Sequence, residues 1–324
     1  MALSIPRTRQ FIRRLDFFNI MAKKIIFVTD FDGTLTRFDT TDISFKACRK
    51  YLDGSLQKRA ELEEVHKERG SVYLNGYSKC FNEGINQFGS DVPSTPSQKS
   101  LIDFVVSLDA YNRDSRVTIA NKHLLDDIIE DKDILRKFCK DVSYQEQSLE
   151  TLRWLQEESS STVVTADNKV ASCLKVLSVN WFKPVLVECL EGIVNSENIV
   201  SALPPILAKD GSLDLGPASS SIDKLKWIKK WKIDFGGDEC FCVYVGDSMT
   251  DLLALLEADV GILVGKNRHV LETVKVFGLD FVTITKADSD EHLEINNKND
   301  NRLYYADSWN EIYLFLKKIL NNSS

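Results

Sequence analysis

Short, continuous apolar runs alternate with amphipathic stretches along much of the chain. One run, residues 23–30 (KKIIFVTD), ends in polar residues, and a similar run, residues 240–245, ends at Gly246. Runs of this kind are typical of strands buried in a parallel sheet. The second run is followed by leucines at helical spacing (residues 252–256) and by another apolar run, residues 260–264. This alternation predicts an α/β fold with a Rossmann-type, doubly wound parallel sheet, which binds ligands at the carboxyl ends of its strands.

The region after the first strand has a different pattern, which predicts an inserted domain. It holds amphipathic helical stretches with charged residues, at positions 56–69, 124–139 and 145–158. A length of 324 residues also suits two lobes better than one. We therefore predict a mainly helical cap at residues 37–164, inserted into a core that consists of residues 22–36 and 165–324. The core is expected to end with a strand and a helix at residues 303–320.

The first 21 residues form a tail that fits neither domain. They contain four arginines and no acidic residue before Asp16. An amphipathic segment rich in arginine is typical of a mitochondrial presequence, but this one has few serines and small residues. The tail is then either a targeting segment or a non-native start that precedes Met21. We expect the protein to be cytoplasmic, with a mitochondrial location as the alternative.

Composition and charge exclude several classes of protein. Hydrophobic residues make up 43% of the chain and charged residues 27%, which is ordinary globular usage. The net charge of −7 gives no general attraction to nucleic acids or anionic lipids. No apolar run approaches the roughly 18 residues of a membrane span, and the seven cysteines contain no CxxC pair. We expect a soluble protein with reduced thiols and a small-molecule partner, and the sequence indicates no oligomeric state.

Two carboxylates follow the first predicted strand, in the segment Asp30–Thr36 (DFDGTLT). Asp30 and Asp32 lie two residues apart at a strand end, where each loses solvation near the charge of the other. A cation or a shared proton usually compensates such a pair. The alternative is an Asp-Gly turn in which Asp30 only caps a loop.

A second acidic pair, Asp247 and Asp251, follows another predicted strand in the segment GDSMTD. Alone, this segment could be an ordinary helix N-terminus with acidic residues in its first turn. In one parallel sheet, however, the two segments would direct about four carboxylates into one crevice. Their repulsion, of order 1–4 kcal/mol for each close pair, requires a counter-ion. Mg²⁺, which prefers oxygen ligands, meets that requirement.

With these segments, the chain resembles the haloacid dehalogenase-like (HAD) hydrolase superfamily. DFDGTLT matches the first motif of that family and GDSMTD the fourth. The family also has a Ser or Thr after a second strand and a Lys before the fourth motif. Ser178, in Leu174–Ser178, and Lys224, in Ser221–Lys224, fit these places. Thr165 is the alternative for the second motif, and Lys224 could instead be a solvated helix lysine.

The resemblance implies a role for each catalytic residue. Asp30 would attack phosphorus and form an aspartyl-phosphate, and Asp32 would act as general acid and then as general base. Ser178 would bind a phosphoryl oxygen, and Lys224 would neutralise developing negative charge. In this family, Asp at the second position of the first motif is typical of phosphatases rather than of dehalogenases or transport ATPases.

The resemblance also implies the metal ligands. Mg²⁺ would be bound by Asp30, by the backbone carbonyl of Asp32 and by Asp247, and Asp251 would anchor its outer shell. No other cofactor is implied. Mg²⁺ is therefore the expected cofactor of a phosphomonoesterase.

Four segments extend the resemblance to one branch of the superfamily: VLSVNW (176–181), IDK (222–224), residues 246–262 and residues 303–316. Together they are similar to the HAD domain that plants fuse to a TenA-like domain, which acts as a thiamine monophosphate phosphatase, and to stand-alone fungal HAD-like proteins. We expect a phosphatase for a small phosphorylated metabolite, with thiamine monophosphate as one candidate. The alternative is a low-turnover protein phosphatase or a non-catalytic HAD-fold binding or regulatory protein.

Aromatic residues of the cap could contact a heterocyclic substrate, or they could be ordinary core residues. The candidates near the core are Tyr73, Tyr77, Phe81 and Trp181. Aromatic residues at helical spacing are more often buried in a core than exposed to a ligand. We therefore expect packing rather than substrate binding from most of them.

Overall fold

The core of the molecule is one parallel sheet. A computed structural model describes residues 24–90, 98–121, 125, 128, 130–160, 172–287 and 303–321. Within these residues the sheet has seven strands in the order β3-β2-β1-β4-β5-β7-β6, and every pair is parallel. The strands are β1 (Lys24–Thr29), β2 (Ser172–Ser178), β3 (Ile199–Ser201), β4 (Cys240–Gly246), β5 (Val260–Val264), β6 (Phe281–Thr283) and β7 (Leu303–Ala306).

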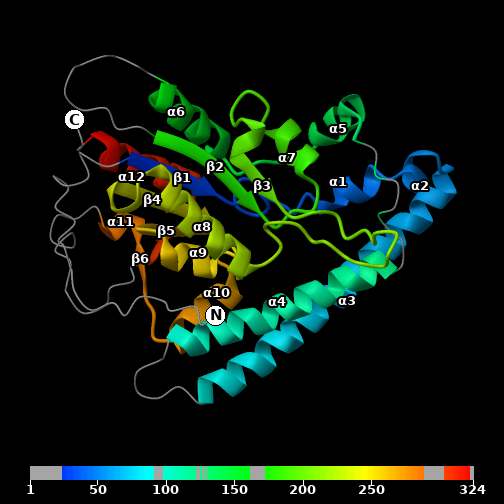
Figure 1. Cartoon of the computed structure of the whole chain (residues 1–324), viewed down its shortest axis with the longest axis horizontal. Coiled ribbons are helices and arrows are strands. Elements are labelled where there is room, and N and C mark those ends of the chain that lie inside the picture. The colour runs from blue at the N-terminus through cyan, green and yellow to red at the C-terminus, as the bar shows by residue number, and fades with distance from the viewer. Residues whose placement is uncertain are drawn as a thin grey trace.

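Helices cover both faces of this sheet (Figure 1). One face contacts α6 (Ser148–Ser160), α7 (Lys183–Cys189) and α12 (Trp309–Asn321), and the other contacts α8 (Ser221–Phe235), α9 (Leu252–Glu257) and α10 (Arg268–Val276). In β1, Ile25 and Phe27 join the first cluster, while Ile26 and Val28 join the second. A strand buried on both faces explains the continuous apolar run. The predicted doubly wound α/β sheet is confirmed.

An insertion leaves the core after β1 and returns before α6. Its neck is an antiparallel bridge between Thr36 and Tyr144, with hydrogen bonds from Arg37 N to Ser143 O (2.8 Å) and from Gln145 N to Leu35 O (2.8 Å). Its helices are α1 (Thr41–Lys46), α2 (Arg49–Leu52), α3 (Leu56–Ser90), α4 (Gln98–Asn121) and α5 (Lys132–Cys139). The described part of the insertion is therefore mainly helical.

The long pair α3 and α4 differs from the sequence-based prediction. The prediction ended the first helix at residue 69 and missed α4, whereas α3 continues to Ser90. Glycines within α3 lower its helix propensity, which hides its length. At Gly76 and Gly84 the partner helix explains them, because an added Cβ would lie 2.1 Å from Tyr111 Oη and 2.7 Å from a ring carbon of Phe104. The predicted helix at 124–139 is shorter, beginning at Lys132.

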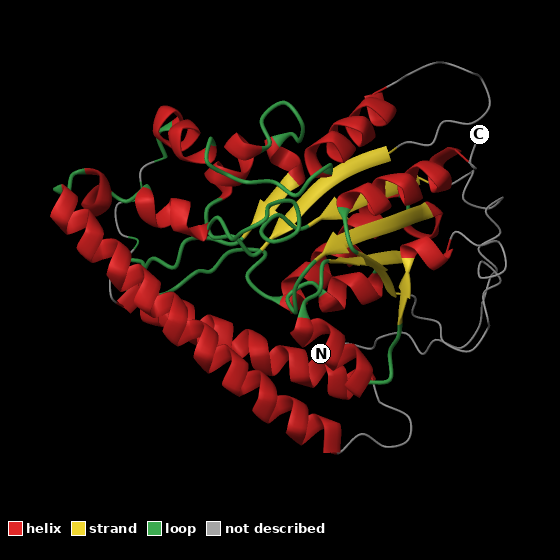
Figure 2. Ribbon diagram, turned by 180° about the vertical axis from the view of Figure 1, so that it is seen from behind, coloured by secondary structure: helices red, strands yellow, loops and turns green. Residues whose placement is uncertain are grey.

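The α3–α4 pair packs on the core and is not isolated from it (Figure 2). Phe81 and Phe104 pack edge to face with ring centroids 5.6 Å apart, and Phe104 stacks on Phe277, which follows α10. These rings belong to the hydrophobic cluster that also contains Ile26 and Val28 of β1. Phe81 is fully buried, as expected for a core residue.

The predicted boundary between the cap and the second part of the core lies close to helix α6. Helix α6 lies within residues 37–164, yet its Leu152 and Leu155 pack in the same cluster as β1 and β2. Where the core ends and the cap begins stays a prediction.

The tail (residues 1–21) and Thr165 lie outside the described residues. No helix in the part of the chain that the structure describes is long and apolar enough to cross a membrane.

The remaining short elements connect the larger ones. They are two 3₁₀ turns, η2 (Ser196–Asn198) and η3 (Gly237–Glu239), and the helix α11 (Ile284–Ala287). The switch point of the sheet lies between β1 and β4: from β1 the next strands, β2 and β3, are added toward one edge, and from β4 the later strands are added toward the other edge. Such a switch point opens a crevice at the carboxyl ends of the strands and is the usual ligand site of this architecture.

Candidate active site

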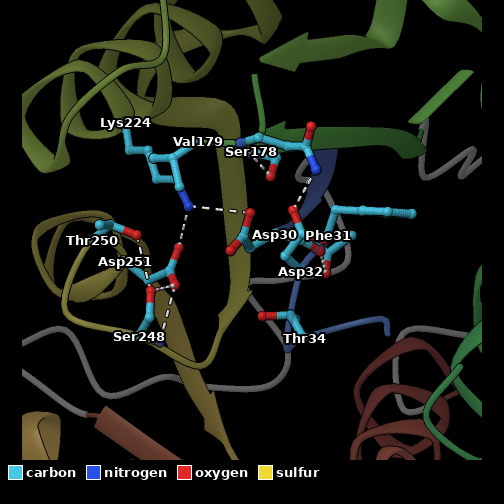
Figure 3. Close-up of polar contacts among 12 residues, drawn as sticks. Asp30, Phe31, Asp32, Thr34, Ser178, Val179, Lys224, Ser248, Thr250 and Asp251 are labelled. Carbon is cyan, nitrogen blue, oxygen red and sulfur yellow. Dashed lines mark hydrogen bonds and ion pairs between the residues drawn. The ribbon is translucent and has the colours of Figure 1, made fainter. Parts of the chain in front are cut away.

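The acidic residues predicted from the sequence meet at the carboxyl ends of β1 and β4. Asp30 follows β1, and its backbone N–H donates to the carbonyl of Val245 at 2.9 Å, which continues the pairing of the two strands. Asp247 and Asp251 follow β4. Figure 3 shows Asp30 and Asp251 on either side of the ammonium group of Lys224.

Lys224 forms a buried ion-pair bridge between two of these carboxylates. Its Nζ lies 3.2 Å from Asp30 Oδ1 and 2.6 Å from Asp251 Oδ1, and its side chain is fully buried. Burial opposes the charged form, but Asp251 and Asp30 outweigh it and raise the pKa of Lys224. The lysine lies in the first turn of α8, whose N-terminus is capped by Ser220. It is not the solvated helix lysine that the sequence left open.

Asp251 is held by a dense set of donors. Tyr244 donates its hydroxyl to Asp251 Oδ1 at 2.6 Å. The other oxygen accepts from the backbone N–H of Ser248 at 3.1 Å and from the Ser248 hydroxyl at 2.8 Å. With Lys224 on Oδ1, both oxygens are hydrogen-bonded, so this carboxyl group is held in one orientation.

Asp30, Asp247 and Asp251 form a group suited to a hard cation. One oxygen of each lies within 4.8 Å of the others. Asp30 Oδ1 is buried without a well-oriented hydrogen bond. Burial raises the pKa of Asp30 to about 6 and, aided by the charges of Asp251 and Asp30, raises that of Asp247 well above its usual range. Oxygen ligands gathered in a buried group that disfavours their charge fit Mg²⁺, which would compensate that charge.

Two neighbours shape this group. Thr34 donates its hydroxyl to Asp247 Oδ1 at 2.8 Å, which fixes the carboxylate against the first motif. Gly33 has φ of +73°, and a Cβ at this position would lie 2.5 Å from Asp247 Oδ2. Only glycine fits here, because a side chain would be both strained and in collision with the carboxylate. The DxDG spacing thus reflects a close approach between two motifs.

Asp32 faces a different set of partners. Its Oδ1 accepts from Thr40 N at 2.7 Å and from Thr40 Oγ1 at 2.6 Å, and its Oδ2 accepts from Asn180 Nδ2 at 2.6 Å. Its carboxylate is not part of the acidic group, which is consistent with a metal contact through its backbone carbonyl alone. Burial, aided by the charge of Asp39, raises the pKa of Asp32 to about 7.

Thr40 and Asn180 are site residues that the sequence analysis did not identify. Thr40 lies in a loop without helical or strand periodicity, and only its hydroxyl group marked it as a possible site residue. Asn180 lies two residues after Ser178, within the segment VLSVNW (176–181) that resembles one branch of the superfamily, which was the better signal. It links two parts of the site, because Nδ2 also contacts Thr40 Oγ1 at 3.0 Å.

Ser178 lies at the end of β2, beside β1, and its side chain is fully buried. Its hydroxyl accepts the backbone N–H of Asn180 at 3.2 Å. Figure 3 shows the serine close to Asp30 and Asp32. The structure therefore brings together all the predicted site residues that it describes, and the alternative, Thr165, lies outside the described residues.

The aromatic candidates have mixed surroundings. Tyr73 and Tyr77 pack against each other with ring centroids 5.9 Å apart, and both contact Tyr111 of α4. Trp181 follows the second motif and lies under the guanidinium of Arg116 at 5.9 Å. Packing within the protein accounts for these contacts, and none requires a ligand.

Sequence comparisons find two curated relatives, although no protein-family model matches the chain. Cold tolerance protein 1 of Saccharomyces cerevisiae is 27% identical over 322 residues, which cover 89% of this chain and 96% of that protein. The mitochondrial Bifunctional TH2 protein of Arabidopsis thaliana is 36% identical over 81 residues, 22% of this chain and 13% of that protein. The chain thus matches nearly the whole yeast protein and a small part of the plant protein.

Solved structures with a similar course of the chain include a phospho-aspartyl intermediate analogue of phosphoserine phosphatase, with a TM-score of 0.42 and 18% identity over 78% of this chain and 91% of that chain. A protein of unknown function from Bordetella pertussis has a TM-score of 0.47 and 13% identity over 80% and 97% of the two chains. The doubly wound sheet, the convergence of the four motifs and the two sequence relatives confirm the resemblance of this chain to the haloacid dehalogenase-like superfamily and to its fungal and plant branch.

Proposed function

We propose that this protein is a Mg²⁺-dependent phosphomonoesterase that hydrolyses a small phosphorylated metabolite through an aspartyl-phosphate on Asp30. The different surroundings of Asp30 and Asp32 carry the proposal. Asp30 faces a buried lysine, whereas Asp32 faces neutral donors and has a pKa of about 7. Two carboxylates with different environments suit a nucleophile and a proton donor.

In the first step, a carboxylate oxygen of Asp30 attacks phosphorus and the bond to the ester oxygen breaks. The leaving alcohol takes its proton from Asp32, which is partly protonated at neutral pH because its pKa is about 7. In the second step, Asp32 removes a proton from water as the water attacks the aspartyl-phosphate. Inorganic phosphate then leaves, and Asp30 is restored.

Two further residues, Lys224 and Ser178, would interact with the phosphoryl oxygens of the substrate. Lys224 is charged and buried 3.2 Å from Asp30, so its ammonium would offset the negative charge of the phosphoryl oxygens. The hydroxyl of Ser178, at the end of the neighbouring strand, would donate to one of these oxygens. Thr40 and Asn180 hold the carboxyl of Asp32 in one orientation.

The donor set fits a resident Mg²⁺ ion. Asp30, Asp247 and the backbone carbonyl of Asp32 would bind it, and Asp251 would anchor the surrounding groups. When bound, the ion supplies positive charge that screens the nucleophile from the anionic substrate. Burial, together with the charges of neighbouring carboxylates, raises the pKa of Asp30 to about 6 and that of Asp247 well above its usual range, so a bound cation would favour the charged form of both.

The substrate is proposed from the resemblance of the motifs. Thiamine monophosphate is the first compound to test, because the VLSVNW, GDSMTD and C-terminal segments are similar to the plant domain that acts on it. The match to the plant TH2 protein covers 13% of that protein, so its activity is only a guide. A cytoplasmic location and a partner limited to small metabolites also stay predictions.

The test is a panel of phosphorylated metabolites, thiamine monophosphate included, assayed for phosphate release with and without Mg²⁺. We expect one compound to be preferred, with activity that depends on Mg²⁺ and is lost in Asp30→Asn. Uniformly negligible rates from a folded protein would favour the binding or protein-phosphatase alternative. Full activity of Asp30→Asn would refute the mechanism.

A further inference from the structure

Helix α4 of the insertion contacts the core at the segments that carry the site residues. Asp109 and Arg116 lie about two turns apart on this helix, and therefore on one face. Both side chains reach the core, Asp109 at the start of α8 and Arg116 at the segment after β2. The two residues are not among those predicted from the sequence, and the proposed mechanism does not use them.

Arg116 is a buried cation that serves two backbone carbonyls. Its Nη1 donates to Ser219 O at 3.1 Å and its Nη2 donates to Val179 O at 3.3 Å. Among the described residues, no carboxylate lies within ion-pair distance of it, although only 7% of the residue is exposed. Its guanidinium also covers the ring of Trp181. One side chain thus connects the segment after Ser178 to the segment before α8.

Asp109 caps the helix that carries Lys224. Its Oδ2 accepts from the backbone N–H of Ser221 at 2.9 Å, and its Oδ1 accepts from the Ser221 hydroxyl at 3.0 Å. Ser221 is the first residue of α8, and Lys224 lies in the same first turn. A carboxylate at this end also complements the helix dipole. The position of the lysine is therefore coupled to α4.

Arg116 is also linked to Asp32, through Asn180. Asn180 lies between Val179 and Trp181, both of which touch Arg116, and its Nδ2 donates to Asp32 Oδ2 at 2.6 Å. The metal-binding carboxylates are different, because they follow β1 and β4, and no contact between them and α4 is present in the described part of the chain. Helix α4 thus contacts the segments on the phosphate-binding side of the site directly, and it reaches the acidic group only through Lys224, whose Nζ lies 3.2 Å from Asp30 Oδ1 and 2.6 Å from Asp251 Oδ1.

We propose that Arg116 and Asp109 are positioning residues: through them, α4 of the insertion holds Ser178, Asn180 and Lys224 in place. This inference rests on the proposed function, since it assigns these groups to a phosphate. The alternative is that both side chains only stabilise the fold. The two can be separated, because a positioning role weakens phosphate binding more than it weakens Mg²⁺ binding.

The experiment compares Arg116→Gln and Asp109→Asn with matched controls at exposed positions of the same helix, Arg113→Gln and Asp114→Asn. Calorimetry measures the affinity of each protein for Mg²⁺ and then, with Mg²⁺ present, for inorganic phosphate. Turnover is measured on the best substrate of the panel, well below the melting temperature. Arg116→Lys, which keeps the charge and the stem, serves as a conservative variant if Arg116→Gln fails to fold.

We expect Arg116→Gln and Asp109→Asn to bind phosphate at least about tenfold more weakly and to lose up to about 10²-fold in kcat, because small displacements of positioning groups cost this much. Mg²⁺ affinity should fall much less than phosphate affinity, Arg116→Lys should recover part of the loss, and both controls should behave as wild type.

A lower melting temperature with unchanged phosphate affinity and kcat would overturn the proposal, because the residues would then be only structural. Equal losses of Mg²⁺ and phosphate affinity would overturn it as well. If the wild type hydrolyses nothing but binds phosphate, and Arg116→Gln weakens that binding alone, the positioning role stands and the phosphatase function falls. A wild type that neither binds phosphate nor hydrolyses any ester would refute both.

Discussion

Replacing Asp30 by Asn should make the metal-free protein more stable at pH 8. Burial raises the pKa of Asp30 from 3.8 to about 6, and Asp251 adds to this effect while Lys224 opposes it. The folded state therefore holds this proton more tightly than the unfolded chain does. Stability increases as the pH falls from about 6 toward 4, and above pH 6 the full cost of the charge is present. Asn is uncharged and avoids that cost.

The size of the effect follows from the pKa. A shift of about two units corresponds to about 3 kcal/mol in the free energy of unfolding. The assay is urea unfolding in EDTA, at pH 8 and at pH 4.5, for wild type, Asp30→Asn and the exposed control Asp114→Asn. The gain of Asp30→Asn should be largest at pH 8 and small at pH 4.5, and the control should show no gain at either pH.

A wild type that is more stable than Asp30→Asn at pH 8 would refute this reasoning. The carboxylate would then be stabilised by its surroundings, and Lys224 alone would compensate its charge. The acidic group would in that case need no cation. A cation at the acidic group is expected only if Asp30→Asn is more stable than the wild type at pH 8.

Three shorter predictions test other parts of the site. Asn180→Ala should move the alkaline limb of the pH profile of kcat to higher pH, because the Asn180 amide donates to the ionised form of Asp32 and lowers its pKa. If the alkaline limb stays at the same pH in this variant, Asp32 is not the acid. Gly33→Ala should weaken Mg²⁺ binding at least about tenfold in calorimetry, because the added Cβ would collide with Asp247, and it should destabilise the protein by about 1–2 kcal/mol, because φ at this position is +73°. Unchanged Mg²⁺ affinity would show that Asp247 is not a metal ligand. Adding Mg²⁺ at pH 8 should raise the melting temperature of wild type and much less that of Asp30→Asn, and equal increases would place the ion elsewhere.

The core of the fold could be predicted from the sequence because buried parallel strands appear as continuous apolar runs. β1, β4 and β5 are such runs, and the acidic segments after β1 and β4 meet because parallel strands share an edge. The meeting of Asp30, Asp247 and Asp251 needed no knowledge of side-chain packing.

The partners of Asp32 could not be predicted in this way. Thr40 comes from a loop and Asn180 from the segment after β2, and only the folded chain brings them to one carboxyl group. The same holds for Arg116, which is one of two arginines on α4 and cannot be told from the other until its burial is known. Contacts between segments far apart in the sequence leave no periodic signal in either segment.

The most direct test of the central claim is to identify the phosphorylated residue. Wild-type protein and Asp30→Asn are mixed with the preferred substrate and Mg²⁺, quenched in acid within the first turnover, digested and analysed by mass spectrometry. The account predicts a phosphoryl group on the peptide that contains Asp30 in wild type and none in Asp30→Asn. Rapid turnover without any phosphorylated peptide, or a phosphoryl group on a different residue, would contradict it.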